Sequence, residues 1–168
     1  MEKSEGFPPI ANASARILVL GSLPGRKSLL EKEYYAHPQN VFWPVMKEIF
    51  GALGSYEERC ACLLRHGIAV WDVLQASVRP GSMDADIQLD TAIANDFDAF
   101  FEQHPRIQGV AFNGKTAEKL FRVRVVSHRA SRLRTLALPS TSPAYASMPF
   151  EGKLERWRSG MIWLRRDN

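Results

Sequence analysis

ILVLGSLPGRKSLLEKEYYAHPQNVFW, residues 17–43, joins an apolar run, a turn containing glycine and proline, and a cluster of rings and amides. The run RILVLG at 16–21 ends at a glycine and is typical of a parallel strand buried on both faces. The cluster suits a flat ligand with polar edges, because rings offer a stacking face and amides both donate and accept hydrogen bonds. Its members are Tyr34, Tyr35, His37, Gln39, Asn40, Phe42 and Trp43. The stretch therefore predicts a strand leading into a ligand-binding loop; the alternative is a loop whose aromatic residues are ordinary core.

Length and composition indicate one soluble globular domain. The chain has 168 residues, 45% hydrophobic and 24% charged, which is enough for a core that needs no metal or disulfide. Cys60 and Cys62 would point to different faces of a helix, and there is no cysteine–histidine array with zinc spacing. No apolar run approaches a membrane span, and the N-terminus is too polar for a signal peptide. We therefore expect a reduced, cytoplasmic protein that has no metal and does not enter a membrane.

Basic residues are concentrated in one segment. The chain has 22 Lys and Arg against 18 acidic residues, a formal net charge of +4. Between Lys115 and Arg134 there are seven basic residues and a single acidic one, Glu118. Such a field suits an anionic partner such as nucleic acid, and a solvated basic face explains it equally well.

Apolar patterns with strand and helix periods alternate along the chain. We expect buried strands at 16–21, 68–74, 107–114 and 134–138, and helices at 41–51, 55–67, 91–103, 115–125 and 149–166. Residues 75–87 are expected to form a loop because they include Pro80, Gly81 and several small polar residues. This alternation predicts an α/β fold, a three-layer α/β/α sandwich with a central, mostly parallel four-stranded sheet. Residues 1–15 are expected to be a flexible N-terminal lead-in and residues 16–168 a single domain.

Polar or aromatic residues follow each expected strand at its carboxyl end, where open α/β sheets bind ligands. They are GSLPG at 21–25, Trp71-Asp72, Asn113-Gly114 and LPSTSPAY at 138–145. GSLPG has the spacing of neither a phosphate loop nor a dinucleotide fingerprint, and Ser22 is not in a Gly-x-Ser-x-Gly elbow. A small-molecule hydrolase or nucleotide-binding domain would leave the ring-rich loop and the basic segment unexplained.

Taken together, these motifs resemble those of the uracil-DNA glycosylase superfamily. GSLPG followed by YYAHPQNVFW at 34–43 is similar to its first motif, LPSTSPA at 138–144 to its second, and GKTA at 114–117 to its third-strand turn. The resemblance covers roughly residues 16–165 and is nearest to the hypoxanthine-DNA (deoxyinosine) glycosylases, with the mismatch-specific G:U/T enzymes next. It implies a base-excision repair enzyme that flips a deaminated base and hydrolyses its N-glycosidic bond with water, without metal or cofactor.

Leu23 distinguishes the two nearest branches of that superfamily. Mismatch-specific members carry Gly-Ile-Asn-Pro-Gly at the first turn, and their asparagine positions the attacking water. The hypoxanthine branch lacks a polar residue there and relies on the asparagine of His-Pro-x-Asn, which is Asn40 in this chain. The resemblance therefore favours excision of hypoxanthine, with uracil as a weaker substrate. The alternatives are a G:U/T-specific enzyme and a non-catalytic nucleic-acid-binding module of the same fold.

The resemblance also implies roles for individual residues. The catalytic candidates are Asn40 and His37, and the base-binding candidates are Tyr35, Ser22, Leu23 and Asn113. The DNA-binding candidates are Ser140, Ser142, Lys115 and Tyr145, the last as a wedge that fills the gap left by a flipped base. Arginines between 122 and 134 would add affinity for phosphates. His37, Asn113 and Asp72 could instead brace or cap turns. The expected partner is double-stranded or single-stranded DNA containing deaminated bases, bound by a monomer.

Overall fold

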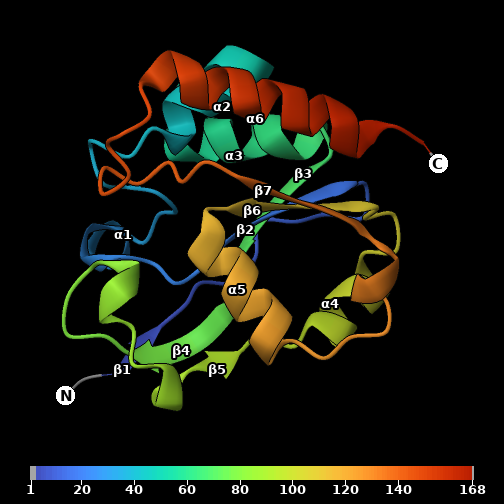
Figure 1. The fold of residues 1–168 in the computed structure, drawn as a ribbon. Helices are drawn as coiled ribbons and strands as arrows, with labels where there is room; N and C mark the ends of the chain where they lie inside the picture. The colour runs from blue at the N-terminus through green and yellow to red at the C-terminus, as the bar shows by residue number, and fades with distance from the viewer. Residues whose placement is uncertain (1–2, 168) are drawn as a thin grey trace.

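Four parallel strands, in the order β3-β2-β6-β7, form the central sheet in a computed structural model that describes residues 3–167 (Figure 1). They are β2 (Ile17–Gly21), β3 (Ile68–Asp72), β6 (Gly109–Asn113) and β7 (Arg134–Leu138). Every residue of β2, β3 and β6 is buried, which explains why these strands read as continuous apolar runs. The expected four-stranded sheet is confirmed, and all its pairings are parallel.

Helices cover both faces of this sheet, as expected for a three-layer α/β/α sandwich (Figure 1). One face carries α2 (Phe42–Phe50), α3 (Tyr56–Arg65) and α6 (Phe150–Arg165), and the other carries α4 (Phe97–Gln103) and α5 (Lys115–Arg124). Local signals set some helix ends. Ser55 forms a capping box with Glu58 at the start of α3, and Gly51, at φ +75°, ends α2.

A second, antiparallel sheet was not expected. It consists of β1 (Lys3–Glu5), β4 (Leu74–Val78) and β5 (Ile93–Ala94), in the order β1-β4-β5. The prediction that 75–87 is all loop is therefore wrong over 75–78. These residues, QASV, have no clear strand pattern, and their strand partners lie elsewhere in the sequence. Short 3₁₀ turns, η1 (Asp84–Asp86) and η2 (Leu89–Thr91), complete this region.

Two further predictions of local structure differ from the structure. The helix expected at 91–103 begins only at Phe97, because Asp96 caps it by accepting a hydrogen bond from the Ala99 N–H at 3.1 Å. Ile93, which falls within the expected helix, lies exposed in β5. The charged stretch after the first turn, expected as a loop, contains the short helix α1 (Arg26–Glu31).

The described part of the expected lead-in, residues 3–15, contacts both sheets. β1 pairs with β4, Ile10 and Val70 exchange two backbone hydrogen bonds of 2.9 Å, and Ala15 is buried. The division of the chain at residue 16 stays a prediction. Within residues 3–167, no helix is both long and apolar enough to cross a membrane.

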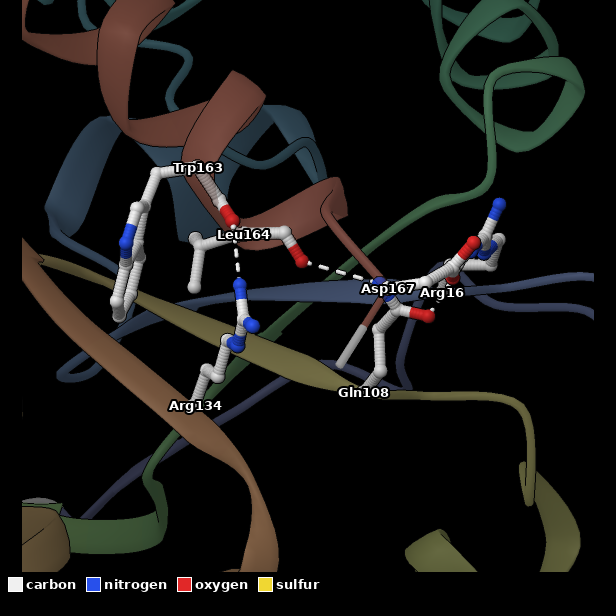
Figure 2. A network of polar contacts seen from close by, with 6 residues as sticks. All are labelled: Arg16, Gln108, Arg134, Trp163, Leu164 and Asp167. Carbon is white, nitrogen blue, oxygen red and sulfur yellow. Dashed lines mark hydrogen bonds and ion pairs between the residues drawn. The ribbon is translucent and has the colours of Figure 1, made fainter.

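A polar network closes the amino end of the sheet (Figure 2). Arg16, just before β2, donates to Gln108 at 3.0 Å and pairs with Asp167 at 2.9 Å. Gln108 in turn donates to the Leu164 carbonyl at 3.2 Å, and Arg134 donates to the Trp163 carbonyl at 3.1 Å. These contacts tie the strand starts to the end of α6, so the opposite, carboxyl end is the edge that remains for a ligand.

Candidate functional site

The carboxyl ends of the four parallel strands meet at one cleft of about 1000 Å³. Gly21, Asp72, Asn113 and Leu138, which end the strands, all line it, so the predicted convergence is confirmed. Every site residue predicted from the sequence also lines this cleft: Ser22, Leu23, Tyr35, His37, Asn40, Asn113, Lys115, Ser140, Ser142 and Tyr145. The structure thus brings together side chains that are more than 120 residues apart in the chain.

Gly21 lets two polar side chains approach the backbone at the inner end of the cleft. A β-carbon at this position would lie 2.6 Å from Asp72 Oδ1 and 2.8 Å from the Tyr35 hydroxyl. Atoms of this kind do not approach so closely, so only glycine fits. The Val73 N–H donates to the Gly21 carbonyl at 2.8 Å and keeps the ends of β2 and β3 together. Asp72 and Tyr35 therefore converge because position 21 has no side chain.

The carboxyl of Asp72 and the hydroxyl of Tyr35 are both strongly affected by burial. Burial, reinforced by the nearby Asp84, raises the pKa of Asp72 from 3.8 to about 7. Burial also raises the pKa of the Tyr35 hydroxyl, which therefore stays protonated. Among the residues that the structure describes, Asp72 Oδ2 and the Tyr35 hydroxyl have no hydrogen-bond partner. Buried polar atoms are rarely left unpaired, so a ligand in the cleft would find both available.

The ring-rich segment divides into core and site. Tyr34, Phe42 and Trp43 are buried, and the Trp43 indole N–H donates to the Tyr34 carbonyl at 2.8 Å. Tyr35 adopts a left-handed backbone conformation, φ 55°, and packs against Phe42 with 4.1 Å between ring centroids and 32° between ring planes. One face of the Tyr35 ring is therefore supported, while the residue itself lines the cleft. The core interpretation is therefore confirmed for Tyr34, Phe42 and Trp43, whereas ligand binding by Tyr35 stays a prediction.

Hydrogen bonds to its own loop fix the orientation of Asn40. Its amide oxygen accepts from the Phe42 N–H at 3.0 Å, and its backbone N–H donates to the His37 carbonyl at 2.9 Å. An amide oxygen has two lone pairs, so one remains to accept from a water molecule. His37 is exposed, and its Nδ1 accepts from the Gln39 N–H at 3.1 Å, which braces the same turn.

Thr141 joins the first motif to the second. The Thr141 N–H donates to Asn113 Oδ1 at 2.9 Å, and Asn113 Nδ2 donates to Thr141 Oγ1 at 2.8 Å. The Thr141 carbonyl accepts from the Val41 N–H, beside Asn40, at 3.0 Å. The end of β6, the loop after β7 and the start of α2 are therefore held in one arrangement. Asn113 thus has the bracing role that its position before Gly114 made possible.

Cationic side chains line the cleft from several elements. Lys115 begins α5, and Arg26, Lys27 and Arg156, which come from α1 and α6, were missed by the sequence reasoning. No local pattern identifies them, because only the fold brings α1 and α6 to the same edge. The arginines from 122 to 134 do not line the cleft. Arg124, for instance, lies about 14 Å from Lys115 along the helix axis and donates to the Leu89 carbonyl.

Arg79 is a further residue that the sequence did not identify. It is buried, and its guanidinium donates to the carbonyls of Leu23 and Pro24, at 3.4 Å for Leu23. It therefore holds the GSLPG turn against β4.

In the described residues no group of three or more histidine, cysteine or acidic side chains is placed to hold a metal ion.

With this geometry established, comparison with known proteins identifies the family. Residues 8–160 match the sequence profile described as the uracil DNA glycosylase superfamily. The chain belongs to this superfamily. Among curated members it is 41% identical over 116 residues to a protein of Methanosarcina barkeri named hypoxanthine DNA glycosylase, covering 67% of this chain and 72% of that protein.

Two further superfamily comparisons come from Methanosarcina acetivorans. A protein of this organism, also named hypoxanthine DNA glycosylase, is 35% identical over 145 residues, covering 83% of this chain and 86% of that protein. A solution NMR structure of a candidate uracil DNA glycosylase superposes with a TM-score of 0.81 at 29% identity, covering 98% of this chain and 100% of that one. The superfamily resemblance and the uracil-DNA-glycosylase-like fold are both confirmed.

Proposed function

We propose that this superfamily member is a monofunctional DNA-deoxyinosine (hypoxanthine) glycosylase of base excision repair. It hydrolyses the N-glycosidic bond of hypoxanthine in DNA, and that of uracil more weakly. The two relatives named hypoxanthine DNA glycosylase support this substrate. The observation that carries the proposal is the position of Asn40, whose amide is held by the Phe42 N–H on the wall of the cleft that Tyr35 also lines.

Asn40 holds the attacking water through the free lone pair of its amide oxygen. An amide is a poor general base, so its contribution is position and charge stabilisation as the sugar becomes cationic. Leu23 is buried and apolar, and it cannot hold a water at the position where mismatch-specific relatives carry asparagine. His37 keeps the Asn40 turn in place through its carbonyl. The water is therefore positioned from the Asn40 side of the cleft.

The flipped base stacks on the free face of Tyr35, which Phe42 supports from behind. Ser22 and Leu23 form the floor of this pocket. Asn113 binds Thr141 with one N–H and one lone pair of its amide, which leaves one of each for a base edge. The Tyr35 hydroxyl and the Asp72 carboxyl, both unpaired within residues 3–167, add a donor and an acceptor at the inner end.

DNA lies across the mouth of the cleft. Lys115, with the other cations that line the cleft, neutralises phosphates. The hydroxyl oxygens of Ser140 and Ser142 already accept hydrogen bonds from loop N–H groups at 3.2 Å, so their O–H groups are left to donate to phosphate oxygens. Tyr145 fills the gap left by the flipped base. The enzyme acts as an intracellular monomer on double-stranded or single-stranded DNA.

A panel of oligonucleotides tests this proposal. Duplexes and single strands with one hypoxanthine, uracil or xanthine are incubated with the protein, and abasic sites are cleaved with alkali. Hypoxanthine strands should be cut fastest. Faster cutting of uracil opposite guanine would favour the G:U/T-specific alternative. DNA binding without cutting above an enzyme-free control would favour the non-catalytic alternative and refute the proposal.

A further inference from the structure

Lys153 on α6 is a buried lysine whose ammonium contacts the loop at Tyr145. It is 5% exposed, and its ammonium donates to the Tyr145 carbonyl at 2.6 Å. The same nitrogen lies 5.1 Å from the centroid of the Tyr145 ring, within the range of a cation–π interaction. One lysine therefore contacts both the backbone and the ring of Tyr145.

No carboxylate compensates this buried charge in the part of the chain that the structure describes. The ion pairs there join Arg16 to Asp167, Lys27 to Glu31 and Arg122 to Glu118, and none includes Lys153. Burial of an ammonium is costly, and it lowers the pKa of Lys153. A methionine would fill the same space between helix and loop at lower cost. The ammonium is therefore explained by its contacts with Tyr145 in the loop and not by the packing of α6.

Tyr145 needs such a support. Tyr145 is 39% exposed and lines the cleft, and its own backbone N–H bonds within the loop, to the Ser142 carbonyl at 3.0 Å. A side chain that enters the base stack must keep its orientation while it displaces a stacked base. The adjacent Pro143 and Ala144 offer no comparable ring, and Lys153 binds neither.

We propose that Lys153 is a positioning residue that holds the Tyr145 ring ready to enter the base stack of duplex DNA. This inference rests on the proposed glycosylase function and on Tyr145 as the wedge. It has a specific consequence, because a single-stranded substrate has no opposite strand and needs little help to expose its base. Lys153 therefore matters more for duplex DNA than for single strands.

The test compares single-turnover excision of hypoxanthine from matched duplex and single-stranded oligonucleotides. In Lys153→Met, the duplex-to-single-strand rate ratio should fall about tenfold, as expected when the support of an inserted side chain is lost. Lys153→Gln keeps an N–H donor for the Tyr145 carbonyl and should retain an intermediate ratio. Lys119→Met, which removes an exposed lysine from α5, should leave the ratio unchanged.

A double-mutant cycle separates positioning from other roles. If Lys153 acts through Tyr145, the variant with both Tyr145→Ala and Lys153→Met should have the same rate ratio as Tyr145→Ala alone. Additive losses, or a smaller salt dependence of binding in Lys153→Met, would instead mean a direct phosphate contact and would overturn the inference. Equal losses of excision rate by Lys153→Met on duplex and single-stranded DNA would overturn the inference too. Absence of all excision by the unmodified protein would refute the proposed function itself.

Discussion

Asn113 and Thr141 exchange two hydrogen bonds, 2.9 Å from the Thr141 N–H to Asn113 Oδ1 and 2.8 Å from Asn113 Nδ2 to Thr141 Oγ1. Both residues are buried, so this pair is sheltered from water where β6 ends and the second motif begins. The pair makes the cleft a rigid junction of strand ends rather than a gap between independent loops.

Asn113→Ala should lower the free energy of unfolding by about 1–3 kcal/mol, because it leaves the buried Thr141 N–H without a partner. Thr141→Val keeps that N–H bonded to Asn113 and leaves only one side-chain N–H of Asn113, at the wall of the cleft, without its acceptor, so it should cost less. Urea denaturation followed by tryptophan fluorescence measures both. A larger loss in Thr141→Val would contradict the ordering.

Asn40→Ala should reduce the excision rate by roughly 10²-fold, because the water loses its positioning group. It should also lower stability by about 1 kcal/mol, since the Phe42 N–H loses its acceptor. Asn40→Ser is the matched control: its hydroxyl can still accept from that N–H but is too short to hold the water. Compared with Asn40→Ala, Asn40→Ser should recover stability but not excision activity. If activity returns with stability, Asn40 only stabilises the start of α2.

Gly21→Ala should destabilise the protein by about 1–3 kcal/mol, because the new methyl group would overlap Asp72 and the Tyr35 hydroxyl. Gly25→Ala, in the same turn, is the control. There the nearest atom would lie 3.7 Å away, and φ is −74°. That variant should differ from the original protein by less than about 0.5 kcal/mol. Equal effects at both positions would refute the close approach at Gly21.

Asp72→Asn should change how stability depends on pH. The pKa of Asp72 is raised from 3.8 to about 7, so the folded protein binds this proton more tightly than the unfolded chain. Stability is then lost as the pH rises from about 4 to about 7, by up to about 4 kcal/mol. The asparagine variant lacks this loss, so its advantage over the original protein should grow across that window and stay constant above it.

Thermal unfolding of both proteins between pH 4 and pH 9 checks this expectation. Glu155→Gln, which neutralises an exposed carboxylate on α6, serves as the control for the loss of one acidic group. A constant difference between Asp72→Asn and the original protein over the whole range would show that Asp72 does not titrate in this window.

Lys115→Ala should reduce the salt dependence of DNA binding. A plot of the logarithm of the binding constant against that of the salt concentration should become less steep by about 0.9, the effect of one phosphate contact. Arg122→Ala removes a charge from the same helix but away from the cleft, and should leave the slope unchanged. Fluorescence anisotropy with a labelled duplex measures both. Equal changes would mean that the basic segment acts as a whole.

Much of the α/β sandwich could be predicted because its signals are local. Residues 134–138 were predicted as a strand and form β7 without a shift at either end. A helix was predicted to begin at residue 55, and Ser55 caps it through Glu58, only three residues away. Patterns of this kind depend on period and on neighbours in the chain, which are visible before folding.

The β1-β4-β5 sheet could not be predicted in the same way. Residues 74–78, LQASV, have no clear strand pattern and become a strand because Lys3–Glu5 and Ile93–Ala94 supply hydrogen-bond partners. Nor could local sequence show that Arg26 and Arg156 line the same cleft as Lys115. Contacts of this kind depend on how distant segments pack, and no short pattern encodes them.

The segment 17–43 shows which features can be predicted from the sequence and which depend on tertiary packing. Its order of residues was enough to predict a buried strand, a glycine turn and a set of rings and amides with a chemistry suited to a flat ligand with polar edges. Tertiary packing alone decided that Tyr34, Phe42 and Trp43 enter the core while Tyr35 and Asn40 line the cleft. The reason is physical: rings of one kind are adjacent in the chain, and only the positions of β2, α2 and Thr141 determine which of them water or a ligand can reach.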